Sequence, residues 1–117
     1  MKIILSILSV LLVACTAPKT EIPTGILSET AFASILKEIH LAEAAFKLNK
    51  SKGIENAKNT LANSYQSIYK KYDVTDTTFS KSLDYYAKHP EKLEKIYTTV
   101  LEQLTGERST LDQQETN

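Results

Sequence analysis

The amino-acid sequence predicts an all-α protein, a small bundle of about four helices. Apolar residues recur at steps of three and four along four segments, which is the spacing of an amphipathic helix. The three glycines, Gly25, Gly53 and Gly106, all fall at the boundaries of these segments, and no proline interrupts an apolar stripe. Because the chain breaks agree with the periodicity, both observations indicate the same fold.

The first two predicted helices form a hairpin. The first begins at Ser28, which suits an N-cap, with Glu29 in the first turn, and it reaches about Leu48. The second runs from about Ile54 to Tyr72. Their apolar stripes consist of Phe32, Ile35, Leu36, Ile39, Ala42 and Phe46 in the first helix and Ala57, Leu61, Tyr65, Ile68 and Tyr72 in the second.

Two shorter helices are expected to follow. Thr75 or Asp76 suits the N-cap of the third, and Pro90 cannot continue that helix but suits the first position of the fourth. Their apolar residues are Phe79, Leu83 and Tyr86 in the third helix and Leu93, Ile96, Tyr97, Val100, Leu101 and Leu104 in the fourth.

Gly106 is predicted to end the fourth helix as its C′ residue. The helical domain would then span residues 28–106. Residues 107–117 are polar apart from Leu111, and we expect them to be a disordered tail.

The start of the chain predicts export. Met1-Lys2 supplies a positive charge, and residues 3–13 form an apolar run that is too short to cross a bilayer core of about 30 Å. The run ends in Leu12-Val13-Ala14-Cys15, which resembles the lipobox of bacterial lipoproteins. The resemblance implies that residues 1–14 are a cleaved signal peptide and that Cys15 carries covalent lipid.

Residues 15–27 are predicted to be the lipidated cysteine and a tether. The segment holds two of the three prolines and shows little hydrophobic periodicity. Stretched at about 3.3 Å per residue, the part after Cys15 would lift the domain by roughly 40 Å. Alternatively, Ile22, Ile26 and Leu27 could dock onto the helices, which would shorten that reach.

Composition and the residues after Cys15 indicate the location. Lys and Arg number 14 against 14 Asp and Glu, so no basic excess favours nucleic acid or an anionic membrane. Thr16 follows the cysteine where an Asp would resemble an inner-membrane retention signal, and no acidic run follows. We therefore expect a lipid-anchored protein of the cell envelope, attached to the outer membrane through its acyl chains and facing the periplasm.

Several short segments have a distinctive order and spacing. They are His40-Leu41-Ala42-Glu43, Phe79, Leu83, Tyr85-Tyr86, His89-Pro90-Glu91-Lys92-Leu93 and Ile96-Tyr97. Together they resemble small lipoproteins that carry the domain of unknown function 4296, over nearly the whole domain. The resemblance implies an exported lipoprotein, and it implies no reaction and no catalytic residues.

His40, Glu43 and His89 are a candidate polar cluster. His40 and Glu43 face the same way on a helix, and a distant His89 could complete a metal site if the fold brought it near. The alternative is a local hydrogen bond between His40 and Glu43, with His89 capping the fourth helix. Two dispersed histidines fall short of a zinc signature, so we predict no metal and no cofactor besides the lipid.

Six tyrosines carry much of the aromatic area, since the chain has no tryptophan. Most are expected in the core or at its rim. Tyr69 and Tyr85 lie off the main stripes and are predicted to face a partner protein. If both are exposed, replacing them with alanine should change stability by no more than about 1 kcal/mol.

No motif indicates an enzyme. The chain has no glycine-rich phosphate loop and no serine in a nucleophile elbow, and its carboxylates alternate with lysines as on a solvated helix face. We expect a non-enzymatic periplasmic accessory subunit that contacts another envelope protein, with no nucleic acid and no small-molecule substrate. A ligand- or lipid-binding module, with an apolar cavity between the first, second and fourth helices, is the alternative. An enzyme would require His40, Glu43 and His89 to converge.

Overall fold

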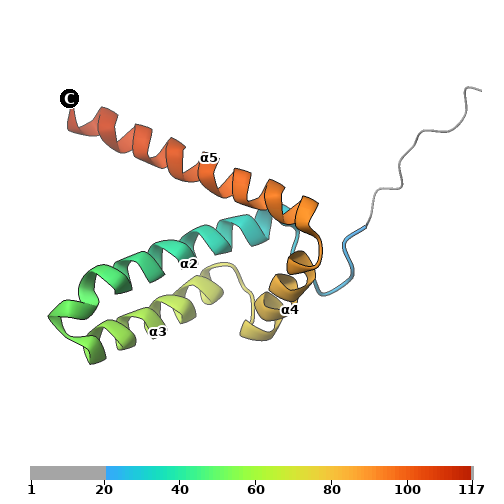
Figure 1. The fold of residues 1–117 in the computed structure, drawn as a ribbon, viewed down its shortest axis with the longest axis horizontal. Helices are drawn as coiled ribbons and strands as arrows, with labels where there is room; N and C mark the ends of the chain where they lie inside the picture. The colour runs from blue at the N-terminus through green and yellow to red at the C-terminus, as the bar shows by residue number, and fades with distance from the viewer. Residues whose placement is uncertain (1–20, 117) are drawn as a thin grey trace, which may run out of the picture.

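The computed structural model describes residues 21–116, and the predicted signal peptide, Cys15 and the first part of the tether lie outside them. The elements are α2 (Glu29–Asn49), the 3-10 turn η1 (Lys50–Lys52), α3 (Ile54–Lys71), α4 (Asp76–Ala87) and α5 (Pro90–Glu115) (Figure 1). The described residues contain no strand. The prediction of an all-α fold with four helices is confirmed. None of these helices combines the length and the apolar character needed to cross a membrane.

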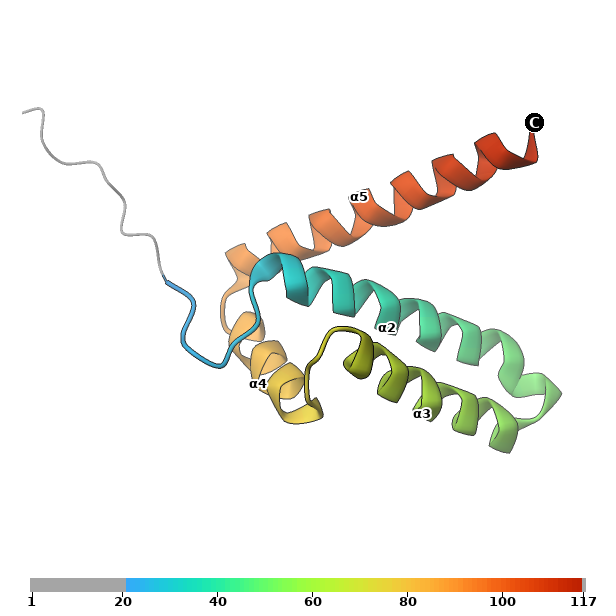
Figure 2. The ribbon, with the colours of Figure 1, turned by 180° about the vertical axis from the view of Figure 1, so that it is seen from behind.

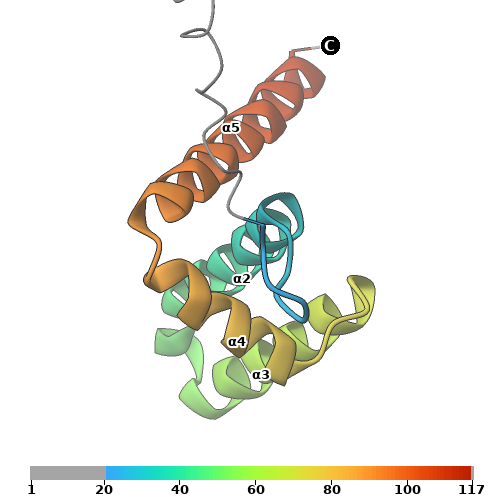
Figure 3. The ribbon, with the colours of Figure 1, turned by 90° about the vertical axis from the view of Figure 1, so that its right-hand side faces the viewer.

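Helix α2 is the centre of the molecule. Helix α3 returns along one side of it and α5 runs along another, while α4 crosses the end at which α2 and α5 begin (Figures 1 and 2). Figure 3, which looks onto that end, shows α4 in front of α2 and α3. Because α3 and α5 lie on different sides of α2, the helices form an open arrangement that closes only at the α4 end.

Local sequence signals set the helix starts. The Ser28 hydroxyl accepts a hydrogen bond from the Ala31 amide at 3.2 Å, and the Thr75 hydroxyl accepts one from the Thr78 amide at 3.1 Å. Each satisfies an amide that the helix itself leaves without a partner. Pro90 is the first residue of α5. Both N-caps and the proline start stand where the sequence predicts them.

The hydrophobic core lies where all four helices meet. Phe32 of α2 is fully buried, and its ring centroid lies 5.4 Å from that of Phe79 and 4.9 Å from that of Tyr86. The buried cluster consists of Phe32, Ala33, Ile35, Leu36, Ile39, Ile68, Phe79, Tyr86, Ile96 and Val100. Its α2 members all lie in the first half of that helix. The second half of α2, the start of α3 and the end of α5 therefore extend beyond the core.

The predicted end of the last helix at Gly106 is wrong, because α5 continues through it to Glu115. A glycine inside a helix costs only about 1 kcal/mol, and no proline follows to stop the chain. Lys37 of α2 also forms an ion pair with Glu107, one residue past the glycine. The polar residues 107–115 are thus helical, where the sequence predicted a disordered tail.

Part of the predicted tether is fixed to the domain. The Leu27 amide donates to the Ser82 hydroxyl at 2.9 Å, and the Tyr86 hydroxyl donates to the Leu27 carbonyl at 2.6 Å. Ser82 and Tyr86 are fully buried, and Ile26 and Leu27 pack against the core. Buried backbone groups outside a helix need such partners. The predicted docking of Ile26 and Leu27 is confirmed, and Ile22 is half-buried.

Replacing Tyr86 with phenylalanine is expected to lower the free energy of unfolding by about 1 kcal/mol at neutral pH, because the Leu27 carbonyl loses its donor. Burial, followed by the charge of Glu29, raises the pKa of Tyr86 to about 12. A tyrosine in the unfolded chain titrates near pH 10. Only the unfolded chain releases this proton between about pH 10 and 12. The contribution of Tyr86 to the free energy of unfolding is therefore fully present below about pH 10 and decreases as the pH rises towards 12.

Urea unfolding at pH 7 and pH 11, followed by circular dichroism, measures both effects. The Tyr86→Phe protein should lose less stability between the two pH values than the wild type does. Tyr97→Phe is the matched control, because the Tyr97 side chain is 45% exposed and its hydroxyl should contribute little at pH 7. Equal losses for the two variants would show that the contact with Leu27 has no role in stability.

Candidate functional site

The structure does not bring His40, Glu43 and His89 into one cluster. Nδ1 of His40 lies 3.6 Å from a carboxylate oxygen of Glu43, whereas Nδ1 of His89 lies 2.6 Å from the Tyr85 carbonyl oxygen. In the part of the chain that the structure describes, no group of three or more His, Cys, Asp or Glu side chains could hold a metal ion. The prediction of one polar cluster is wrong. The ring of His89 lies against Tyr85, near the end of α4, and does not join His40 and Glu43.

The alternative prediction for these residues is closer to the structure. His40 and Glu43 form a local pair on α2, and His89 is the N-cap residue of α5. Its backbone carbonyl accepts hydrogen bonds from the amides of Lys92 and Leu93, both at 3.0 Å, while its ring makes no capping bond. His89 therefore caps the helix through its backbone.

The pair of His40 and Glu43 connects three helices. The Tyr65 hydroxyl of α3 donates to Glu43 at 2.6 Å, and burial together with this hydrogen bond raises the pKa of Tyr65 to about 12. On the other side, the His40 ring stacks with Tyr97 of α5 at 6.4 Å between centroids. These contacts lie one turn beyond Ile39, the last residue of α2 in the buried cluster. They link α2 to α3 through Glu43 and Tyr65 and to α5 through His40 and Tyr97.

Tyr69 and Tyr85 are not the exposed pair that the sequence predicts. Both are half-buried and pack against the core. The Tyr69 ring lies 5.8 Å from that of Phe79, and the Tyr85 ring lies 5.2 Å from that of Tyr86. Tyr69 is partly covered because α4 crosses the end of the bundle, whereas Tyr85, on α4 itself, packs against Tyr86 and His89. In contrast to Tyr69 and Tyr85, Tyr97 on α5 has an exposed side chain.

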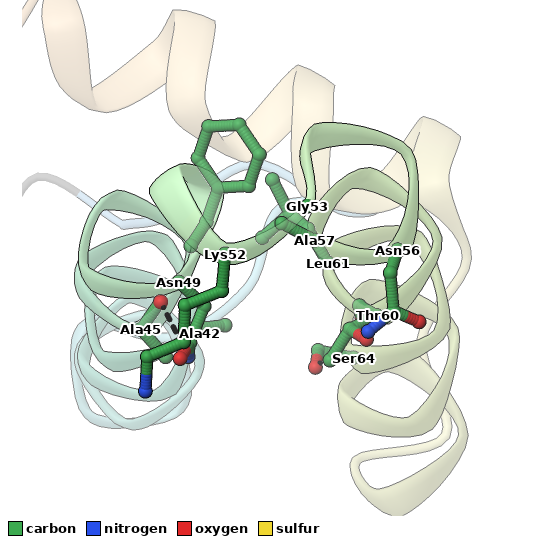
Figure 4. A pocket seen from close by; sticks show the side chains of 11 residues that line it. Ala42, Ala45, Asn49, Lys52, Gly53, Asn56, Ala57, Thr60, Leu61 and Ser64 are labelled. Carbon is green, nitrogen blue, oxygen red and sulfur yellow. Dashed lines mark hydrogen bonds between the residues drawn. The ribbon is translucent and has the colours of Figure 1, made fainter.

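A groove lies between α2 and α3. It consists of two adjoining hollows of about 220 and 430 Å³, which share Ala42, Thr60 and Ser64. Figure 4 shows Ala42 and Ala45 of α2 opposite Thr60 and Ser64 of α3. Small side chains on both facing helices leave space that larger ones would fill. The groove is therefore a direct result of residue size at these positions.

The groove combines an apolar floor with a mostly neutral polar rim. Ala57 is buried in the floor with Leu61 beside it, and amide and hydroxyl side chains line the edges. Among the described lining residues, the charged ones are Lys52 at one end and Glu38 at the other; Glu38 pairs with Lys71 at 2.9 Å. Such a lining offers hydrogen bonds and apolar contact, which suits a polypeptide segment or a small neutral ligand.

Sequence reasoning missed this groove because it assigned Ala42 and Ala57 to the apolar stripes. The available signal was the spacing of small residues, at 42 and 45 on one helix and at 57, 60 and 64 on the next. That spacing has a meaning only when the two stripes are known to face each other.

Comparison with known proteins gives one result. The family model described as a domain of unknown function, DUF4296, matches residues 23–110. Neither the curated proteins nor the solved structures contain a match. The matched range includes the docked part of the tether, the whole of α2, α3 and α4, and α5 as far as residue 110. The chain belongs to the DUF4296 family.

Proposed function

We propose that this protein is a lipoprotein of the cell envelope that acts as a non-enzymatic accessory subunit, held in the periplasm from the outer membrane. The lipobox-like sequence that ends at Cys15 supports the anchor. One acyl chain binds a membrane marginally, whereas two or three bind effectively permanently, so lipid on this residue would be a sufficient attachment. The docking of Ile26 and Leu27 fixes the end of the predicted tether to the helical domain.

The interaction role rests on the groove between α2 and α3. Its floor is apolar, its rim carries amide and hydroxyl groups, and it runs along two helices from Asn49 and Gly53 towards Glu38 and Ile68. A segment of another envelope protein, extended or helical, can place apolar side chains on such a floor while its polar groups meet the rim. We infer that the partner is a protein of an outer-membrane assembly.

A ligand-binding module is the second candidate, and the same groove favours it. The predicted cavity for this role lay between the first, second and fourth helices, but the hollows of the groove are lined by α2, η1, α3 and Gly53, and no residue of α5 contributes. The more enclosed hollow, at about 220 Å³, is smaller than the roughly 300–1,000 Å³ of typical small-molecule pockets, and the second hollow, at about 430 Å³, is more open to solvent. A polypeptide partner therefore suits the groove better.

Filling the groove is expected to abolish partner binding. Ala45 is exposed and lines the more enclosed hollow, so Ala45→Phe should fill that space without disturbing the core. Chemical crosslinking in intact cells, followed by pull-down through a tag after Asn117, should recover a stoichiometric envelope protein with the wild type. With Ala45→Phe, its recovery should fall at least about tenfold, the equivalent of about 1.4 kcal/mol of binding free energy.

Ala62→Phe is the matched control. Ala62 is exposed on α3 and does not line the groove, so the same added ring should leave recovery unchanged. Both variants should unfold within about 0.5 kcal/mol of the wild type, as surface substitutions usually do. Recovery of the wild-type chain without any partner, or equal recovery with Ala45→Phe, would refute the proposed role of the groove.

A further inference from the structure

Two parts of the molecule that extend beyond the buried cluster leave large apolar side chains exposed. The hairpin tip, residues 47–58, has Leu48 exposed at 76% and Ile54 at 45%. The α5 end, residues 101–115, has Leu101 exposed at 64% and Leu111 at 60%. Single exposed apolar residues are common on protein surfaces, but here they occur in pairs on two separate projections.

These two surfaces carry opposite charge. The hairpin tip has four lysines and one glutamate, a net charge of +3, and the α5 end has four acidic residues and one arginine, a net charge of −3. The charged residues are Lys47, Lys50, Lys52, Glu55 and Lys58 at the tip and Glu102, Glu107, Arg108, Asp112 and Glu115 on α5. The chain as a whole has equal numbers of acidic and basic residues, so the separation is local.

Most of this charge is not neutralised within the molecule. Between residues 21 and 116, no ion pair involves Lys47, Lys50 or Lys52, and none involves Glu102 or Glu115. Each surface therefore keeps several exposed charges that are open to a partner of the opposite sign.

The α5 end also has the residue spacing of a helix-packing face. Counting from Tyr97, the residues at steps of four and three are Leu101, Leu104, Arg108, Leu111 and Glu115. Residues at such steps lie on one side of a helix and form the contact line when two helices pack. Helix α2 covers α5 at Ile96 and Val100, Leu104 packs at the edge of the core, and Lys37 of α2 pairs with Glu107, after which the two helices diverge (Figures 1 and 2). On this face Leu101 and Leu111 remain exposed in the described structure, whereas Leu104 is partly buried.

We propose that two copies of this chain associate, with the hairpin tip of each copy against the α5 end of the other. Within one copy the two surfaces lie on separate arms of the molecule (Figure 1). Their opposite charges and exposed apolar side chains can therefore contact each other only between two copies. In a twofold dimer each contact occurs twice, and each covers exposed leucines and pairs lysines with carboxylates. An anionic membrane would bind the basic tip alone and leave the acidic α5 end exposed. A second copy would cover both surfaces.

This inference goes beyond the proposed function, because it concerns the contact between two copies. The hairpin tip shares Asn49, Lys52, Gly53, Asn56 and Ala57 with the groove, but the charge reversals described below change none of the residues that line it. Two full-length copies with different short tags, expressed together in cells, provide the test. A photoreactive amino acid in place of Leu111 in one copy should form a covalent dimer that contains both tags. The crosslinked peptide of the second copy should come from residues 47–58.

Charge reversal makes the test specific. An acidic-face variant (Glu102→Lys, Asp112→Lys, Glu115→Lys) and a tip variant (Lys47→Glu, Lys50→Glu, Lys58→Glu) each place like charges together at both contacts. Each variant expressed alone should give at least about tenfold less crosslinked dimer. When the two variants are expressed together, both contacts again join opposite charges, and the dimer should return. This recovery also shows that both variants fold.

The control variant Lys70→Glu, Lys81→Glu, Lys88→Glu reverses three exposed lysines outside both surfaces and should leave the yield unchanged. Three results would each overturn the proposal: no covalent dimer with the wild type, a yield that neither reversal lowers, or no recovery in the mixed pair. A probe at Leu48 that labels lipid and not the second copy would overturn it in favour of a membrane surface. The pull-down designed for the groove could still succeed after any of these outcomes.

Discussion

Replacing Phe32 with alanine is expected to remove about 3–5 kcal/mol of the free energy of unfolding. The Phe32 side chain is fully buried, and it stacks on rings from α4 while its own helix contacts α3 and α5. The cavity would therefore open at the one place where all four helices meet. Small domains are stable by only about 5–15 kcal/mol, so this single change would remove a large part of the total. Urea unfolding followed by circular dichroism measures the loss.

Leu83→Ala is the control for this prediction. The sequence assigns Leu83 to the apolar stripe of the third helix, but its side chain is 43% exposed. Truncating it should cost less than about 1 kcal/mol, because a large part of the side chain already contacts water and little apolar area would be lost from the interior. A loss below about 1 kcal/mol for Phe32→Ala, or equal losses for the two variants, would show that the core is not centred on this ring.

Replacing Cys15 with serine is expected to abolish lipid modification completely. The thiol is the group that receives the diacylglyceryl chain, and the sequence contains no other cysteine. Growth with a labelled fatty acid should mark the wild-type protein and leave the Cys15→Ser protein unmarked. The serine variant should also keep its leader and migrate at the mass of the precursor.

Thr16→Ser is the control, because it changes the adjacent residue and keeps the thiol; its labelling should match that of the wild type. If Cys15→Ser still takes up the label, or if fractionation finds the wild-type protein freely soluble with an uncut leader, the proposed anchor is wrong. In that case the accessory role in the envelope would lose its basis as well.

The helix starts could be predicted because their causes are local. A hydroxyl at Ser28 or Thr75 needs only the next few amides in order to cap a helix, and Pro90 restricts its own backbone. The end of α5 was mispredicted for the opposite reason. Gly106 is a weak helix stop, and the contact of Glu107 with Lys37 spans 70 residues of sequence. Nothing near Gly106 in the sequence indicates that contact.

The candidate sites were harder to predict, because each depends on which helix faces which. The positions of Tyr69 and Tyr85 beside the stripes suggested exposure, but Tyr69 lies against Phe79 of α4 and Tyr85 lies against Tyr86 and His89, so both are partly buried. His89 lies too far along the chain for its position relative to His40 to be inferred from helical spacing. The groove needs two stripes of small residues to face each other, and a single stripe shows only that its residues are small.

The sequence by itself determined the all-α class, the starts of the four helices and the apolar stripe of α2 that contains Phe32. It also carries the lipobox-like segment on which the proposed location depends. These features follow from hydrophobic periodicity and from hydrogen bonds that span a few residues. Only the tertiary structure decided that α2 is central, that Leu27 is fixed by Ser82 and Tyr86, and that α5 extends past the core. Those outcomes depend on packing between segments far apart in the chain. The energy of each such contact is set by residues that a local sequence pattern cannot identify.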